Sequence, residues 1–269
     1  MIPPQVNLTA IARQEMAERG FEPDLPAAAL AQAADARQQA DPGLENLTAL
    51  YWSSIDNDDS RDLDQIEWAE RTAAGIRVLV AIADVDSAVA KGTPIDAYAA
   101  HETTTVYAGI HTFPMLPERL STDQTSLGEE QDRVAVVIEM TVAADGATAA
   151  HRIFRALVRN RAQLTYSAVG AWLAGTAAAP AKVAASAELE AQLRLQDEAA
   201  HLLRAARDQK GALTFDRAEL QSTVVNGQVK GIEGRVANTA SQLIEDFMIG
   251  ANEVMAETLR AAGGRNGGD

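Results

Sequence analysis

The chain has 269 residues, and its 38 acidic residues outnumber its 23 lysines and arginines, which gives a formal net charge of −15. It has no cysteine, which excludes a disulfide-stapled fold and disfavours a thiolate zinc site. With no membrane-spanning apolar run and no secretion signal at the N-terminus, we expect a cytoplasmic protein without a membrane partner. The acidity argues against a nucleic-acid coat protein, but it allows an enzyme that holds metal cations and grips nucleic acid locally.

The first 45 residues are predicted to form a helical N-terminal segment. Apolar residues at helical spacing predict a helix over residues 7–20, and an alanine-rich stretch favours a second helix over residues 27–40. Asp41-Pro42-Gly43 would end that helix. We therefore divide the chain into an N-terminal segment, residues 1–45, and a larger domain, residues 46–269.

From residue 47 onward the pattern changes to strands and helices interspersed with hairpins. Strands are expected over 47–55, 76–85, 134–142 and 151–158, the last two joined by a turn at Asp145-Gly146. Helices are expected over 167–173, over 187–207 with Gly211 as cap, and from a Thr239–Gln242 capping box to about Leu259. Asn226-Gly227 predicts one more hairpin. Without regular βαβ alternation, this order predicts an α+β (mixed α/β) fold.

Residues 56–67 form a dense acidic loop, with six carboxylates within twelve residues. Such crowding is costly unless the side chains spread into water or converge on a cation. A solvated acidic turn is the simplest interpretation, but the loop follows an apolar run, where acids often point into a site. A calcium loop fits the alternating acids from Asp56 to Glu67, yet Arg61 stands where a sharp turn needs glycine, and a strand precedes it. The third interpretation is a magnesium site for phosphodiester hydrolysis, built on Asp56, Asp62 and Asp64.

The acidic loop also carries a family resemblance. Ser54-Ile55-Asp56, followed after five residues by Asp62-Leu63-Asp64, resembles the signature of the catalytic (RNB) domain of the ribonuclease II/R family. Further segments resemble that domain in the same order, namely 81–85, 106–107, 113–117 with 120–121, 161–166, 211–216, and 243–248 with 251–252. The resemblance implies a mixed, mainly antiparallel sheet packed with helices.

The resemblance further implies a 3′→5′ exoribonuclease that hydrolyses single-stranded RNA to nucleoside 5′-monophosphates with Mg²⁺, for which Mn²⁺ could substitute. Asp62 and Asp64 match catalytic acids, and the metal site would comprise Asp56, Asp62, Asp64 and Gln65. RNA contacts would come from two aromatics that clamp stacked bases, a tyrosine near the scissile end, and an acid at the terminal ribose. These are Tyr107 and Phe215, Tyr166, and Glu245. Stacking on bases is sequence-tolerant, although simple core packing explains many single aromatic residues equally well.

Two departures from the family pattern bear on activity. Gln65 stands at the family's fourth acid, and its amide oxygen brings no charge to a metal. The chain ends before the family's later catalytic segment with its arginine and before its RNA-binding module. We therefore expect a domain that is incomplete at its C-terminal end, with additional RNA-binding domains in a longer parent chain. The alternatives are a catalytically weak RNB-like module that binds RNA or protein, and a calcium-binding protein.

One basic stretch stands out, with arginines at 152, 155, 159 and 161. On a strand, Arg155, Arg159 and Arg161 would share a face by odd numbering, from which they could contact phosphates. Arg161 is accordingly an RNA-binding candidate, and a solvated sheet edge is the equally weighted alternative.

Overall fold

A computed structural model describes residues 6–39, 41–212, 219–225, 228–235 and 237–263. Contacts divide the chain into two compact units. Unit 1 comprises Met1–Arg37, Val85–Gln124 and Asp216–Val236, and unit 2 comprises Gln38–Asp84, Thr125–Phe215 and Ala237–Asp269. The division after residue 45 stays a prediction. Among the described residues, no helix is both long and apolar enough to cross a lipid bilayer.

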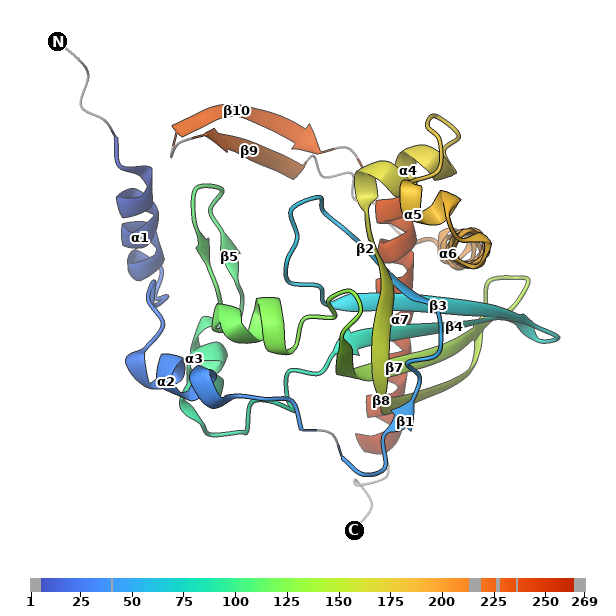
Figure 1. Cartoon of the computed structure of the whole chain (residues 1–269), viewed down its shortest axis with the longest axis horizontal. Coiled ribbons are helices and arrows are strands. Elements are labelled where there is room, and N and C mark those ends of the chain that lie inside the picture. Colours follow the sequence, from blue (N-terminus) through green and yellow to red (C-terminus); the bar gives the residue numbers. More distant parts are fainter. Residues whose placement is uncertain (1–5, 40, 213–218, 226–227, 236, 264–269) are drawn as a thin grey trace. The chain divides into compact units, whose positions relative to one another are not determined.

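Unit 1 is built from short helices and two small hairpins (Figure 1). Its helices are α1 (Leu8–Glu18), α2 (Ala27–Asp35) and α3 (Pro94–Glu102), followed by a π-helical turn (Arg119–Gln124). Its hairpins pair β5 (Val106–Tyr107) with β6 (Thr112–Phe113), and β9 (Glu219–Val225) with β10 (Gln228–Arg235). The first helix is confirmed, and the second ends early because Ala36 adopts an extended backbone. The hairpin around residues 226–227 is confirmed by its strands, while its turn lies outside the described residues.

Helix α3 anchors the connection between α1 and α2. The backbone N–H of Glu22 donates to the Glu102 carboxylate at 2.8 Å, and the Tyr98 hydroxyl donates to the Glu22 carbonyl at 3.0 Å. Small apolar residues of α2 pack with Ile95 and Leu120 in a core of their own. Unit 1 is therefore stabilised by these hydrogen bonds and by a small apolar core.

Unit 2 contains a six-stranded sheet in the order β1-β8-β2-β3-β4-β7, and β7 also pairs with β8, so that the strands close on themselves. The strands are β1 (Glu45–Asn46), β2 (Trp52–Asp56), β3 (Gln65–Thr72), β4 (Gly75–Ala83), β7 (Asp132–Val142) and β8 (Thr148–Thr165). Strand β8 runs parallel to β1 and β2, and the other pairs are antiparallel. The sheet thus confirms the predicted α+β class.

Two of the expected strands differ most from the structure. The strand expected over 47–55 begins only at Trp52 and runs to Asp56, because residues 47–50 form a turn closed by a hydrogen bond from Leu50 N–H to the Leu47 carbonyl. Strand β8 runs seven residues beyond the expected Val158. It does so because, after leaving β7, it continues alongside β2. Strand β3 was not predicted from the sequence.

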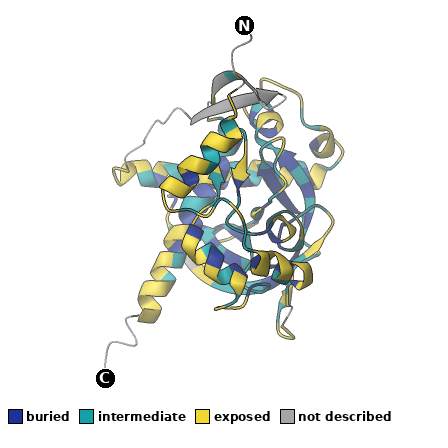
Figure 2. Cartoon of the chain, turned by 90° about the vertical axis from the view of Figure 1, so that its left-hand side faces the viewer, coloured by how far each residue is buried: buried dark blue, intermediate teal, exposed yellow. Residues whose placement is uncertain are grey.

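The described residues of unit 2 also form four helices, namely α4 (Tyr166–Leu173), α5 (Ala181–Ala184), α6 (Ala187–Gln209) and α7 (Thr239–Gly263). Apolar residues of α4, α6 and α7 pack on one face of the sheet, against Ile55, Val80 and Met140. A second core on another face gathers around Trp52, Ile66 and Leu79. The last turns of α7 are mostly exposed (Figure 2).

The ends of the long helices test the capping predictions. Gly211 follows α6 with a φ of +81°, the left-handed conformation that glycine favours, as predicted. The capping box of α7 lies one residue earlier than expected. Asn238 Oδ1 accepts from the Ser241 N–H at 3.0 Å, and Ser241 Oγ accepts from the Asn238 N–H at 2.9 Å. This reciprocal pair makes Asn238 the cap instead of Thr239.

Candidate active site

The acidic loop connects β2 to β3 in unit 2. Strand β2 ends at Asp56, and β3 begins at Gln65. Asp56 lies beside Thr165 in the parallel pairing of β2 with β8, and Thr165 is the N-cap of α4. The loop therefore starts where two strands end and a helix begins (Figure 1).

The first half of the loop is docked on this β8–α4 junction. Asp56 Oδ1 accepts hydrogen bonds from the Asn57 N–H at 2.7 Å and from the Ser60 hydroxyl at 2.8 Å. The Ser167 hydroxyl donates to the Asp58 carboxylate, with oxygen distances of 2.9 and 3.1 Å. These bonds to carboxylates are charge-assisted and favour a single loop conformation.

The second half of the loop is fixed by its backbone on either side of the buried Leu63. The Leu63 N–H donates to Ser126 Oγ at 3.0 Å, and the Ser126 hydroxyl donates to the Arg61 carbonyl at 3.0 Å. The Asp64 carbonyl accepts from the Ala83 N–H of β4 at 2.9 Å. Because the Leu63 side chain is buried, Asp62 and Asp64 flank an anchored position.

The carboxylates of this loop repel one another. Burial of the carboxyl group, together with the negative charges of Asp62 and then Asp56, raises the pKa of Asp64 to about 6. The residue as a whole is nevertheless solvent-exposed, so its carboxyl is crowded by protein atoms but remains open to water. A divalent cation would relieve this repulsion, and hard carboxylate oxygens are the ligands that Mg²⁺ prefers. The donor set therefore fits a magnesium ion by its chemistry.

The fourth position of the predicted metal set behaves differently. The Gln65 side-chain N–H donates to the Ile55 carbonyl at 3.4 Å, which ties this amide to β2. Within the described part of the chain, no three His, Asp or Glu side chains are gathered as a metal-binding group. The structure therefore brings the charges of Asp56, Asp62 and Asp64 close enough to interact without drawing them into one coordination sphere.

The predicted RNA contacts in unit 2 lie on α4 and α7. Tyr166 is the first residue of α4, directly after Thr165, and is half-buried. Its carbonyl accepts from the Asn238 side chain at 3.0 Å, which joins the start of α4 to the start of α7. Glu245 is exposed on α7, whereas the following Asp246 is buried.

Of the two aromatic residues predicted to stack on bases, the structure describes only Tyr107. Tyr107 lies in unit 1 on β5, opposite Thr112, and is 68% exposed. That exposure argues against simple core packing for its ring. Phe215 lies outside the described residues.

The arginines of β8 are paired with carboxylates. Arg152 bonds Glu45 and Glu139, Arg155 bonds Asp41 and Asp84, Arg159 bonds Asp132, and Arg161 bonds Glu130. Arg161 also donates to the Thr48 carbonyl at 2.9 Å. The stretch is thus largely neutralised within the chain.

A bulge in β8 corrects the expectation that the odd-numbered arginines share a face. Trp52 pairs with Asn160, but the next residue, Ser53, pairs with Ala162, so that Arg161 is the extra residue. Val158 lies in one core, whereas Ala162 lies in the other. The strand therefore changes faces at Arg161.

Glu67, which the sequence suggested only as the last ligand of a calcium loop, is a buried acid on β3. Glu67 is 0% exposed, and both of its carboxyl oxygens lack a hydrogen-bond partner among the described residues. It lies opposite Ser53 on β2, and its carbonyl accepts from the Gln196 side chain of α6 at 3.4 Å. Ser53 Oγ and Gln196 Oε1 likewise have no hydrogen-bond partner within the described part of the chain. Burial, and then the charge of Asp56, raise the pKa of Glu67 well above its usual range. The alternation of Gln65 and Glu67 with apolar neighbours was the available sign of a strand here.

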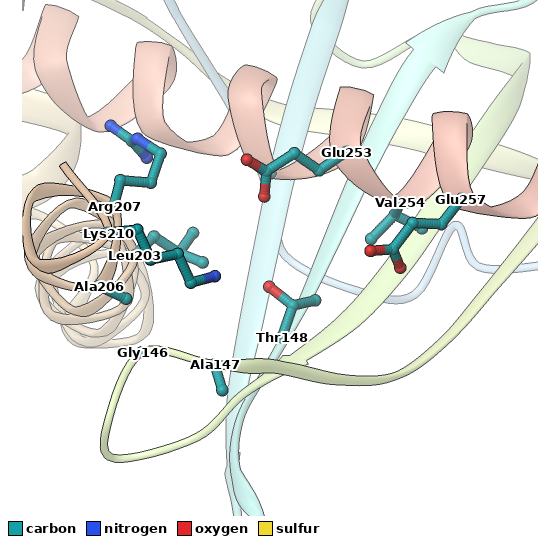
Figure 3. A pocket seen from close by; sticks show the side chains of 11 residues that line it. Gly146, Ala147, Thr148, Leu203, Ala206, Arg207, Lys210, Glu253, Val254 and Glu257 are labelled. Atoms are coloured by element: carbon teal, nitrogen blue, oxygen red, sulfur yellow. The ribbon is translucent and has the colours of Figure 1, made fainter. Parts of the chain in front are cut away.

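Two cavities lie apart from the predicted site residues. One, of about 150 Å³ in unit 2, is lined by the end of α6, by α7 and by the turn before β8, with Lys210 and Glu253 among its charged residues (Figure 3). The other, of about 650 Å³, lies within unit 1 between Leu30 and Arg119. Neither includes an acidic-loop residue.

The calcium-loop alternative loses its structural basis. Such a loop joins two helices, whereas residues 57–64 join strands β2 and β3. Asp58, one of its expected ligands, instead accepts from Ser167. The nuclease interpretation keeps the same acids without needing helical flanks.

Comparison with known proteins identifies the family. Residues 44–266 match the model of the RNB domain. Ribonuclease R of Vibrio cholerae is 34% identical over 228 residues, covering 84% of this chain and 27% of that protein. The chain thus spans about a quarter of this relative's length. Two structures of Mycoplasma genitalium RNase R share the fold, each at 24% identity and covering 95% of this chain. That with double-stranded RNA has a TM-score of 0.89, with 46% of that chain covered, and that with ribose-methylated single-stranded RNA has 0.88, with 40% covered. The chain belongs to the RNB domain family.

Proposed function

We propose that this chain is the metal-binding part of a 3′→5′ exoribonuclease that hydrolyses single-stranded RNA to nucleoside 5′-monophosphates. The observation that carries the proposal is the electrostatic crowding of Asp64 by Asp62 and Asp56 in the loop that follows β2. Crowded carboxylates of this kind are favourable where a cation joins them. Because the chain belongs to the RNB family, we assign this acidic cluster to phosphodiester hydrolysis.

Magnesium would be held by Asp56, Asp62 and Asp64, with the Gln65 amide oxygen as a neutral fourth ligand. When bound, the ion supplies Lewis-acid polarisation of the scissile phosphate and a nucleophile at neutral pH. The chain's own contribution is to hold the acids in place, through the Ser60 and Ser126 hydrogen bonds and the buried Leu63. Asp62 and Asp64, on either side of Leu63, are the acids on which hydrolysis depends most.

RNA would be bound by aromatic and polar side chains that both units supply. Tyr166 begins the helix beside Asp56, which supports a contact between its side chain and the 3′ end of an RNA whose phosphate reaches the loop. Tyr107 offers an exposed ring for sequence-tolerant stacking, worth about 1–3 kcal/mol per base. Phe215, Glu245 and Arg161 complete the proposed contacts. The relative whose structure contains RNA is consistent with this substrate class.

A second candidate function rests on Gln65. Its amide donates to the β2 backbone and brings no charge, so a module that binds RNA but cleaves it poorly is the competing proposal. Additional RNA-binding domains in a longer parent chain would serve either function. The two proposals differ in one observable, which is metal-dependent product.

The test is incubation of the purified chain with labelled poly(A), in Mg²⁺ and in EDTA, beside Asp64→Asn. The nuclease proposal expects Mg²⁺-dependent mononucleotide from the unmodified chain and none from the variant. Equal product from both proteins would refute the role of Asp64. RNA binding without any Mg²⁺-dependent product would favour the binding module. A calcium titration that leaves the protein's spectra unchanged would remove the calcium alternative.

A further inference from the structure

The first turn of α4 grips the acidic loop through one side chain. The Ser167 hydroxyl lies 2.9 Å from one Asp58 oxygen and 3.1 Å from the other. Both residues are exposed, so neither is held there by burial. Loop and helix are far apart in sequence, and Ser167 also lies 3.1 Å from the Thr165 hydroxyl. This contact joins Asp58, two residues after Asp56, to a rigid element.

The helix side of this contact is well fixed. Thr165 caps α4 by accepting from the Ala168 N–H at 3.4 Å. Asn238, itself the cap of α7, donates to the Tyr166 carbonyl at 3.0 Å. The positive end of the α4 dipole also favours a carboxylate beside its first turn. Ser167 therefore holds Asp58 against a helix that two other elements keep in place.

On the acidic loop itself, the residue that follows Asp58 adds no further polar contact within the described part of the chain. Asp59 makes no hydrogen bond or ion pair with the described residues, and it is exposed. The next attachment is Ser60, whose hydroxyl reaches back to Asp56 at 2.8 Å and whose carbonyl accepts weakly from Gln163 at 3.5 Å. Release of Asp58 would remove one of the few ties, beside those of Ser60 and Arg61, that fix the connection between Asp56 and Asp62, two of the proposed metal ligands.

We infer that Ser167 is a positioning residue for the proposed metal site, acting through Asp58 to fix the acidic loop and so to set its affinity for a divalent cation. The inference rests on the proposed function. Because Tyr166 precedes Ser167 on the same turn, the proposed RNA contact and the metal loop share one support. Replacing Ser167 should therefore weaken metal binding, although it removes none of the proposed metal ligands.

The experiment is calorimetric titration of the full chain with Mn²⁺, which reads metal binding without reference to activity. The variants are Ser167→Ala, Asp58→Asn, the two combined, and Ser167→Thr, which keeps the hydroxyl. Asp59→Asn is the matched control, since it removes the same charge from the adjacent residue. Circular dichroism and melting curves verify that each variant is folded.

The expected result is a Kd for Mn²⁺ about tenfold higher in Ser167→Ala, in line with the loss of an outer partner of a metal site. Asp58→Asn should lose at least as much, the double variant little more, and Ser167→Thr should bind like the unmodified chain. Asp59→Asn should change the Kd less than Asp58→Asn. Wild-type affinity in Ser167→Ala, or equal losses in the two Asn variants, would overturn the inference while leaving the proposed function intact. An unmodified chain that binds no Mn²⁺ would instead refute the proposed metal site, and the inference with it.

Discussion

Replacing Asp64 with asparagine should make the metal-free protein more stable, although it should abolish the proposed activity. In the folded chain the pKa of Asp64 rises from its usual 3.8 to about 6, so its ionised form is disfavoured there. A difference of this size corresponds to about 3 kcal/mol. Because Asp64 is exposed and water screens its neighbours, about 1 kcal/mol of that should remain. The variant should therefore melt about 2–4 °C higher near neutral pH in EDTA.

The pH dependence gives the sign of the effect. Below about pH 4 the carboxyl is protonated in both the folded and the unfolded chain, so it costs nothing. As pH rises from about 4 to about 6, the unfolded chain ionises first, and the folded chain loses relative stability. The advantage of Asp64→Asn should thus be present near pH 7 and lost toward pH 4. Melting curves at both values, with Asp59→Asn as the charge-matched control, are the assay. A variant no more stable than the unmodified chain near pH 7, or an advantage independent of pH, would refute the reasoning.

Three further substitutions test the packing of unit 2 by urea unfolding. Asp246 is 1% exposed and forms ion pairs with two arginines of α6. Asp246→Ala should therefore lower the free energy of unfolding by about 3–5 kcal/mol, and a decrease below about 1 kcal/mol would contradict a buried ion pair. The Gln192 side chain accepts from the Ala69 N–H at 2.9 Å and donates to the Ala69 carbonyl at 2.7 Å. Gln192→Leu should therefore lower the free energy of unfolding by about 1–3 kcal/mol, and an unchanged stability would show that these backbone groups of β3 find other partners. Glu67→Leu should be neutral or stabilising near pH 7, because it removes a buried carboxyl without a hydrogen-bond partner among the described residues. A clear loss of stability would show that Glu67 has a partner.

The sequence predicts the elements that have a strong local signal. Strand β4 and helix α6 follow from an apolar run and from helical periodicity ended by Gly211. Strand β3 was missed because it opens inside the acidic run, where charge hides the alternation of Gln65 and Glu67 with apolar neighbours. Its edge is completed by Gln192 of α6, a contact between residues 123 positions apart that no local pattern reveals.

The candidate site shows the same limit. The spacing of Asp56, Asp62 and Asp64 is a sequence feature, and their mutual repulsion follows from it. The face of Arg161 could not be predicted, because a bulge in a parallel pairing depends on the partner strand. Ser167 could not be assigned to Asp58 either, since that contact depends on where β8 ends relative to β2.

The most direct test of the central claim is the first product formed from a 3′-end-labelled single-stranded RNA in Mg²⁺. If the acidic loop supports 3′→5′ hydrolysis, the label should appear at once as a nucleoside 5′-monophosphate. Asp64→Asn and EDTA should each abolish that product. Label that stays in full-length RNA with the unmodified chain, or that first appears in longer fragments, would contradict the claim.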